Sequence, residues 1–331
     1  MLTNEEREIV EKIRKNTVKN NRDNISRTVA YAHYYERNPE IKWSFLASMV
    51  SRNAGWNMCD LAGEWYPRIL SKEYRRRLFL TYERANWLIF SDAYPQLCLY
   101  EESKRNGKCL FHLLKFFSVS SFMEKEWNEF WKINEEERLM ISLIINEQNL
   151  IQRPVINHPV YEHKVFKTWL FLLQDWLHFS TVLFPTRTGQ LYGCSVHDFK
   201  HLSSRIKLGK RLAKVLFHPE VYSQLHEFSI SVEHTGSRHD YEVFLDAEKK
   251  QDTPPLRDVF PVIHHHRHDY KGWNASEKRI VKWLKPVRIP EQMHITDWYK
   301  DKQKQMHYGI LVEQELQQLL SLRKLNPAKS K

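Results

Sequence analysis

The sequence predicts a mainly α-helical, multi-helical globular fold that allows one short β-hairpin. Of its 331 residues, 42% are hydrophobic and 27% are charged, a composition typical of folded proteins rather than disordered ones. Only 9 residues are glycine, and neither of the glycine-rich phosphate-binding motifs, GxGxxG and GxxxxGK[ST], is present. Apolar residues recur with helical spacing along most of the chain. We therefore expect one large helical domain over residues 1–331, with a weak boundary near 153–159.

Helices fill the first half of the sequence. Thr3 and Glu6 form the pattern of a capping box, which predicts that a helix begins there. Pro39 stands where a helix tolerates proline in its first turn, and the helical pattern of 71–92 begins at Ser71. The prolines of RPVINHP, 153–159, end this series because each disfavours a helical conformation in the residue before it. After the first, the expected helices are 24–35, 39–52, 71–92, 95–105, 109–117, 121–132 and 135–151.

The second half mixes helices with turns. The apolar stretch 165–184 is expected to be a buried central helix, because Lys167 and Asp175 would oppose insertion into a bilayer. A helix lying on a membrane surface is the alternative, so peripheral membrane contact stays open. The following FPTRTGQLYGCSVHD is turn-like and suits the hairpin. The remaining expectations are helices at 198–217 and 219–231, a loop at 247–272, and two or three final helices.

The location expected from the sequence is cytoplasmic, with no transmembrane segment. The first residues, MLTNEEREIV, lack the basic and then apolar pattern of a signal peptide. Four scattered cysteines in a chain of this length fit reduced thiols better than a disulfide framework.

A first polar cluster ends the apolar stretch WSFLASMVSRNAGWNMCDLAGE, 43–64. Gly55 is suited to stop a helix in the left-handed conformation, and Asn57 and Asp60 then form a cap for the next helix. Arg52 and Asn53 are left over, since both fall on the apolar half of a helical wheel. They are either structural anchors or part of a ligand site. LASMVSRNAGWN is also similar to the segment around the catalytic acid of lytic transglycosylases, but Asn53 occupies the place of the acid and cannot donate a proton in that way.

A second polar cluster lies in EHTGSRHDYEVFLD, 233–246. Ser237 and Asp240 have capping-box spacing, which leaves His234 and Arg238 without a local role. A Ser–His–Asp nucleophile is an alternative interpretation that lacks the usual strand–turn–helix context. If the two clusters converge on one cleft, the chain is a hydrolase-type enzyme. That candidate site comprises Arg52, Asn53, Asp60, His234, Ser237, Arg238 and Asp240.

The charge balance favours a different function. The formal net charge is +11, which suits an anionic partner such as nucleic acid or another anionic polymer. Two helical faces carry the candidate anion-binding residues: Arg75, Arg76 and Arg77, and then Lys207, Lys210, Arg211 and Lys214. We therefore expect a non-enzymatic binding protein, with the hydrolase as the alternative and enzymatic activity an open question. The sequence does not indicate the oligomeric state.

The stretch VIHHHRHDYKGWN, 262–274, contains alternating histidines. On a strand, His264, His266 and His268 would share one face, a pattern that could bind a divalent metal. The alternative is a polar loop. No CxxC pair is present, so the usual structural zinc spacing is missing. No cofactor is predicted otherwise.

Several stretches together resemble a known family. The run NISRTVAYAHYYERNPEIKWSFLASMVSRNAGWNMCDLAG, followed by RIKLGKRLAKVLF, HTGSRHDYEVF and ITDWY, is similar to the YppC-like, domain-of-unknown-function family of Gram-positive spore-forming bacteria. The resemblance covers most of the chain. It implies a cytoplasmic bacterial protein and assigns no activity, catalytic residue or cofactor.

Overall fold

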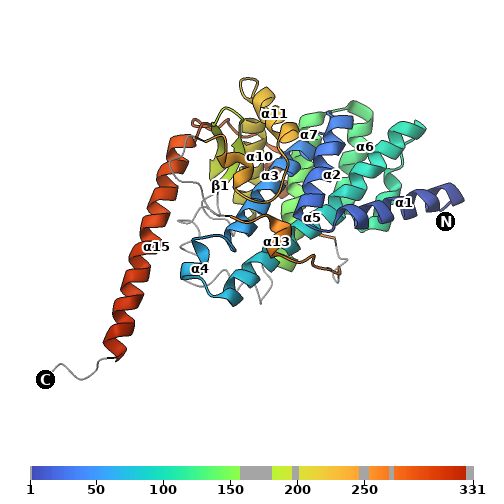
Figure 1. Cartoon of the computed structure of the whole chain (residues 1–331). Helices are drawn as coiled ribbons and strands as arrows, with labels where there is room; N and C mark the ends of the chain where they lie inside the picture. The colour runs from blue at the N-terminus through green and yellow to red at the C-terminus, as the bar shows by residue number, and fades with distance from the viewer. Residues whose placement is uncertain (1, 157–180, 196–200, 246–252, 268–271, 326–331) are drawn as a thin grey trace.

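The chain is mainly helical and has one β-hairpin, as the sequence predicts. The structure, a computed structural model, describes residues 2–156, 181–195, 201–245, 253–267 and 272–325 (Figure 1). The helices are α1 (Asn4–Asn20), α2 (Asn24–Arg37), α3 (Lys42–Asp60), α4 (Tyr66–Ile69), α5 (Lys72–Asn106), the 3-10 helix η1 (Phe111–Phe117), α6 (Ser121–Ile133), α7 (Glu136–Ile151), the π-helical turn η2 (Gln152–Ile156), α10 (Leu202–Leu216), α11 (Tyr222–Ser231), α12 (His239–Glu242), α13 (Leu256–Val259), α14 (Glu277–Leu284) and α15 (Thr296–Leu325).

Local capping fixes where several helices begin. The predicted capping box is confirmed: Thr3 accepts from the backbone N–H of Glu6, whose side chain accepts from the backbone N–H of Thr3. Ser71 caps α5 by accepting from the backbone N–H of Tyr74. Such caps involve residues three apart, so they can be recognised in the sequence.

Two predicted helices are one. The sequence pattern predicts separate helices at 71–92 and 95–105, whereas α5 runs for 35 residues with Pro95 inside it. Proline removes one helical hydrogen bond and favours a kink. Buried Leu88 and Leu97 pack into the core on either side of it, so tertiary packing holds the two halves in one helix. The helix ends at Gly107, which is left-handed with φ 62°.

The predicted helix stop at Gly55 is wrong. Helix α3 continues through Gly55 to Asp60, and Gly55 is not among the residues with positive φ. Asn57 and Asp60 therefore lie inside α3 and cap nothing. The reason for glycine here is proximity: a Cβ at this position would lie 2.4 Å from Asn24 Oδ1 and 2.8 Å from the His234 ring. The missing side chain lets α2 and residue 234 approach α3.

The predicted hairpin is confirmed. Strands β1 (Thr181–Pro185) and β2 (Leu191–Ser195) pair antiparallel, with Thr181 opposite Ser195 and Pro185 opposite Leu191. Residues 181–184 are thus strand, not the end of the helix expected at 165–184. Residues 157–180 of that prediction lie outside the described part of the chain.

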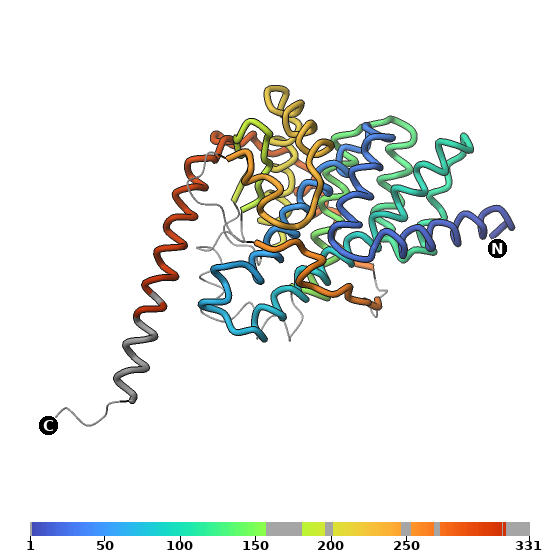
Figure 2. Tube along the Cα trace, viewed as in Figure 1, coloured from blue at the N-terminus to red at the C-terminus, as the bar shows by residue number. Residues whose placement is uncertain are grey.

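The core joins helices that are distant in the sequence. Helices α2 and α3 pack side by side, with α5 and α7 against α3, and the hairpin and α10 cover the other end of α3 (Figures 1 and 2). A second apolar cluster lies under α4, α13 and the start of α5. Helix α15 packs against α4 through Met306 and Ile310 and then extends away from the body (Figure 1). The chain thereby places α3 at the centre, within reach of the 232–240 segment.

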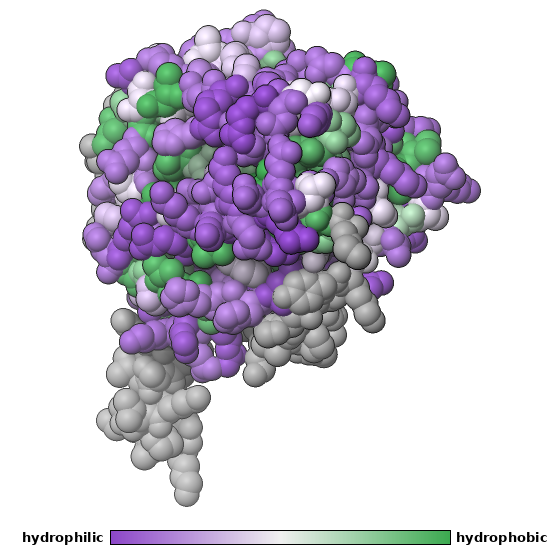
Figure 3. Space-filling model, turned by 90° about the vertical axis from the view of Figure 1, so that its right-hand side faces the viewer, coloured by the Kyte–Doolittle hydropathy of each residue, from purple (hydrophilic) through white to green (hydrophobic). Residues whose placement is uncertain are grey.

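Within the described ranges, no helix combines the length and apolarity needed to cross a membrane. The face in Figure 3 is mostly hydrophilic, with small and separated hydrophobic patches. All four cysteines are free, and only Cys109 is exposed.

Candidate functional site

The structure brings the two predicted polar clusters together. The Arg238 guanidinium donates to both carboxylate oxygens of Asp60, with Nε–Oδ1 at 3.0 Å and Nη2–Oδ2 at 2.7 Å, and Nη2 also donates to Asn57 Oδ1 at 2.9 Å. The two charged side chains are only 4% and 8% exposed. This contact joins the end of α3 to a segment 178 residues further along the chain.

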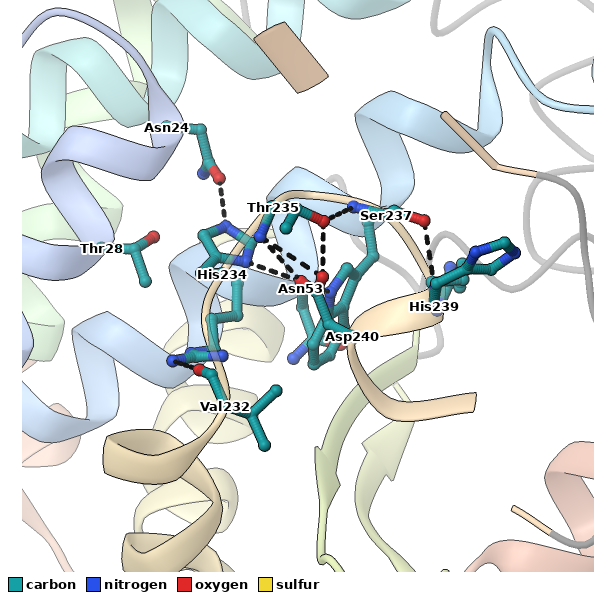
Figure 4. Close-up of polar contacts among 12 residues, drawn as sticks. Asn24, Thr28, Asn53, Val232, His234, Thr235, Ser237, His239 and Asp240 are labelled. Carbon is teal, nitrogen blue, oxygen red and sulfur yellow. Dashed lines mark hydrogen bonds and ion pairs between the residues drawn. The ribbon is translucent and has the colours of Figure 1, made fainter. Parts of the chain in front are cut away.

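His234 is held at both ring nitrogens. Nδ1 lies 3.2 Å from Asp240 Oδ2, and Nε2 lies 2.8 Å from Asn24 Oδ1 (Figure 4). Asp240 also accepts from the Trp56 indole N–H at 3.0 Å and the Thr235 hydroxyl at 2.5 Å. Burial lowers the pKa of His234, and the Asp240 hydrogen bond acts against that effect. The imidazole is fixed in the core rather than presented to a ligand.

Arg52 and Asn53, left over in the sequence, anchor neighbouring backbone. Arg52 Nη2 donates to the carbonyls of Ser229 and Val232, both at 2.8 Å, and burial lowers the pKa of this guanidinium to about 10. Asn53 pairs with one residue of β1: its Nδ2 donates to Leu183 O at 2.6 Å, and its Oδ1 accepts from Leu183 N–H at 2.7 Å. The amide thus extends the edge of the hairpin, which a carboxylate could not do because it lacks a donor.

Ser237 does not form the predicted cap. The capping box would need the Ser237 hydroxyl to accept from the Asp240 N–H. It accepts instead from the N–H of His239, the first residue of α12, at 3.1 Å (Figure 4), and donates to Thr253 O at 2.6 Å. His234 bonds to Asp240 and Asn24 instead, so the Ser–His–Asp alternative is not assembled. We use the name buried polar network for the polar side chains gathered here, of which Arg52 and Asn53 bond to backbone groups and not to the other members: Asn24, Arg52, Asn53, Trp56, Asn57, Asp60, His234, Ser237, Arg238 and Asp240. Its members are all buried.

Several side chains of the two predicted basic faces make hydrogen bonds or ion pairs within the protein. Arg75 donates to Leu61 O at 2.7 Å, and Arg77 pairs with Glu73. Lys210 is buried and donates to Trp283 O and Lys285 O, both at 2.7 Å. Lys214 pairs with Glu137 at 2.6 Å. The remaining side chains of these faces, which make no hydrogen bond or ion pair within the described part of the chain, are Arg76, Lys207 and Arg211.

The histidine segment is irregular where it is described, and not the strand on which the metal hypothesis depends. His264 and His266 are exposed, whereas His265 turns inward onto Trp87, with ring centroids 5.4 Å apart. Burial, followed by nearby Arg84, lowers the pKa of His265 to about 4. His268 lies outside the described residues. Among those that are described, no three His, Cys, Asp or Glu side chains are placed to hold a metal, and the three-histidine site stays a prediction.

A pocket that the sequence analysis did not identify lies beside this segment. We call it the arginine–tryptophan pocket: it has a volume of about 220 Å³ and is lined by Arg84, Arg153, Arg267 and Arg279 together with Trp273 and Trp283. Arg153 and Arg279 are exposed, and their guanidinium groups make no hydrogen bond or ion pair to described residues. Four guanidinium groups around one hollow create a strongly positive potential.

Two further hollows adjoin this pocket. One, of about 570 Å³, shares Leu202, Arg279 and Trp283 with it and adds Lys282. The other, of about 450 Å³, shares Arg267 and is lined as well by Arg14, Trp87, Phe116, His265 and His266. We call the three hollows together the basic track. None of the described residues that line it is acidic, although the chain contains 40 acidic residues.

Buried hydrogen bonds position the pocket. Asp92 Oδ1 accepts from Asn146 Nδ2 at 2.6 Å, and the Trp273 indole N–H donates to Asn146 Oδ1 at 2.8 Å. Arg267 Nη1 lies 4.0 Å from Asp92 Oδ2. Burial raises the pKa of Asp92 to about 6, with Arg267 acting against it. The ring of Trp273 and the guanidinium of Arg267 are therefore fixed by the core formed by α5 and α7.

The sequence carries only weak signals for this pocket. Its arginines come from α5, η2, the 264–273 segment and α14, so no local run of charge marks it. In VIHHHRHDYKGWN the alternating histidines form the recognisable pattern, whereas Arg267 and Trp273, an arginine and a tryptophan in one polar loop, belong to no motif. Such a pair is itself typical of surfaces that bind nucleic acid.

Comparison with known proteins gives a family and no activity. The model of a family described as "Protein of unknown function (DUF2515)" matches residues 19–300. The chain is 48% identical over 310 residues to "Uncharacterized protein YppC" of Bacillus subtilis (strain 168), covering 94% of this chain and 97% of that protein. No solved structure matches.

Proposed function

This chain belongs to the DUF2515 family, and we propose that it is a non-enzymatic binding protein that holds single-stranded nucleic acid along the basic track. The observation that carries the proposal is the composition of the track. Its described lining combines Arg14, Arg84, Arg153, Arg267, Arg279 and Lys282 with tryptophan and phenylalanine rings, and includes no acid.

The two kinds of side chain have separate roles. Arginine and lysine would contact phosphates, which supply most of the affinity in binding that does not depend on sequence. Trp273 is partly exposed and is held by its N–H, so one base could stack on its ring. Single strands leave their bases free to stack, which double-stranded nucleic acid does not.

The hydrolase alternative draws less support from the geometry. It needs a substrate to reach His234, Arg238 and their partners, yet these side chains are buried and bond to one another. A general acid or base must come within hydrogen-bond reach of its substrate. The buried polar network is better explained as a set of contacts that holds the 232–240 segment against α3.

Fluorescence anisotropy with a labelled 20-nucleotide oligothymidine tests the proposal. The expected logarithm of affinity falls linearly with the logarithm of salt concentration, with a slope of about 0.7 for each phosphate contact. Arg279→Gln removes one exposed cation of the track and should reduce that slope by about 0.7. Trp273→Ala removes one stacking ring and should weaken binding about tenfold or more while leaving the slope unchanged.

Arg76→Gln is the matched control, because it removes the same charge from an exposed helical position outside the track. Its binding should stay within about twofold of the wild-type protein. Equal loss in Arg76→Gln and Arg279→Gln would show that overall charge, not the track, attracts the strand. Affinity that does not change with salt would contradict the proposal.

A further inference from the structure

A separate cavity of about 250 Å³ lies between the start of α2, the first half of α5 and residues 256–263. Phe79, Phe260 and Leu256 form part of its apolar wall, and the two phenylalanine rings stack with centroids 3.9 Å apart. It shares no lining residue with the basic track. It is therefore a distinct feature.

One hydrogen-bond acceptor at this cavity has no partner among the described residues. Glu83 lines the cavity and is 3% exposed; its Oε2 accepts from Arg27 Nη2 at 2.5 Å, while its buried Oε1 meets no donor in the described part of the chain. The Nε of Arg27 is likewise buried there without an acceptor, so the ion pair is only partly satisfied. A buried carboxylate oxygen without a donor costs on the order of 1–3 kcal/mol, so native proteins rarely leave one. Burial also raises the pKa of Glu83. A ligand N–H group would supply the missing donor.

The charges around the cavity are separated by depth. The acids are inside, with the Glu83 and Asp23 side chains 4% and 10% exposed. The guanidinium groups are outside: Arg257 pairs with Asp23 and is 56% exposed, and Arg22 is exposed and has no partner in the described part of the chain. This order suits a ligand whose cationic end points inward and whose anionic end points outward.

We propose that this cavity binds an apolar α-amino acid, with its ammonium group on Glu83 Oε1, its carboxylate on Arg22 and its side chain against Phe79 and Phe260. Ammonium and carboxylate groups complement the buried acid and the outer guanidinium, and the apolar wall between them accepts a hydrocarbon side chain. The site is independent of the proposed nucleic-acid binding.

Isothermal titration calorimetry of the full chain with L-leucine tests this site. Leucine should bind saturably with one site per chain. Isoamylamine lacks the carboxylate and isovalerate lacks the ammonium group, so each should bind at least tenfold more weakly. Arg22→Gln should weaken leucine about tenfold, as expected for the loss of one charged hydrogen bond. Arg76→Gln, again an exposed position elsewhere, should leave the affinity unchanged.

Glu83→Gln also breaks the Arg27 pair and could unfold the chain, so a second variant is needed. Val262→Trp fills the cavity from an exposed position and should abolish leucine binding without lowering the melting temperature. The proposal is overturned if leucine shows no saturable binding at millimolar concentration, or if isoamylamine binds as tightly as leucine. A crystal structure grown with leucine that shows only water at Glu83 would also overturn it.

Discussion

Replacing Gly55 with alanine should destabilise the protein, although alanine is the better helix former. Helix propensity alone favours Gly55→Ala by about 1 kcal/mol. The added Cβ, however, would lie 2.4 Å from Asn24 Oδ1 and 2.8 Å from two atoms of the His234 ring. Real Cβ atoms do not approach so closely, so Asn24 and His234 must move apart.

The size of the effect follows from these opposing contributions. Inserting a methyl group into a well-packed interior costs about 1–3 kcal/mol. Displacing Asn24 weakens its 2.8 Å hydrogen bond to His234, which contributes about 0.5–1.5 kcal/mol. Subtracting the gain in helix propensity leaves a net loss of about 2 kcal/mol in the free energy of unfolding.

Urea denaturation followed by tryptophan fluorescence measures this loss. Gly272→Ala is the control, because no atom of the described residues lies within 4 Å of its added Cβ, and the change should stay within about 0.5 kcal/mol. In Asn24→Ala/Gly55→Ala the clash with the amide is gone, so the two losses should be less than additive. A Gly55→Ala protein that is more stable than the wild type would refute the reasoning, since helix propensity would then decide the outcome.

Three further predictions concern buried charges. Asp60→Asn leaves the Arg238 guanidinium without a counter-charge and should lower the free energy of unfolding by about 3–5 kcal/mol. A loss below about 1 kcal/mol in urea denaturation would contradict the claim that this ion pair is buried and stabilising. Because burial raises the pKa of Asp92 to about 6, the folded state holds its proton more tightly than the unfolded state. The stability from this group is full below about pH 4 and is lost as the pH rises through about 6, and Asp92→Asn should remove that part of the pH dependence of urea midpoints between pH 4 and 8. Lys210→Met removes two hydrogen bonds to the carbonyls that end α14. It should speed amide hydrogen exchange at 277–284 and leave exchange in α7 unchanged. Equal exchange at 277–284 in the wild-type protein and the variant would count against a role for Lys210 in holding α14.

The fold could be predicted where its causes are local. The capping box at Thr3, the helix beginning at Ser71 and a hairpin within 184–198 all depend on residues close in the chain, and each is predicted, although the first strand begins at Thr181, in the stretch expected to be helix. Gly55 shows the limit. The sequence predicts that this glycine stops a helix, which is wrong; its role is a close approach to Asn24 and His234, which lie 31 and 179 positions away in the chain. No local pattern contains that information.

The candidate sites divide in the same way. Sequence reasoning singled out Arg52, Asn53 and His234 because each was a polar residue without a local role, and the structure gives each a distant partner. The arginine–tryptophan pocket escaped notice because its cations come from four separate elements. Only the folded chain, in which η2 packs on α5 and α14 packs on α7, places those charges around one hollow.

The partners within the buried polar network lie far apart in the sequence, so this network forms late in the synthesis of the chain. Asp60 acquires its partner Arg238 only after 178 further residues have been added. At typical synthesis rates of about 5–20 residues per second, this takes about 10–35 s. During that interval α5 and α7 emerge and can pack on α3, but Asn24 and Asp60 still lack their partners His234 and Arg238. The contacts between α3 and the 232–240 segment therefore form only when the last third of the chain has been made.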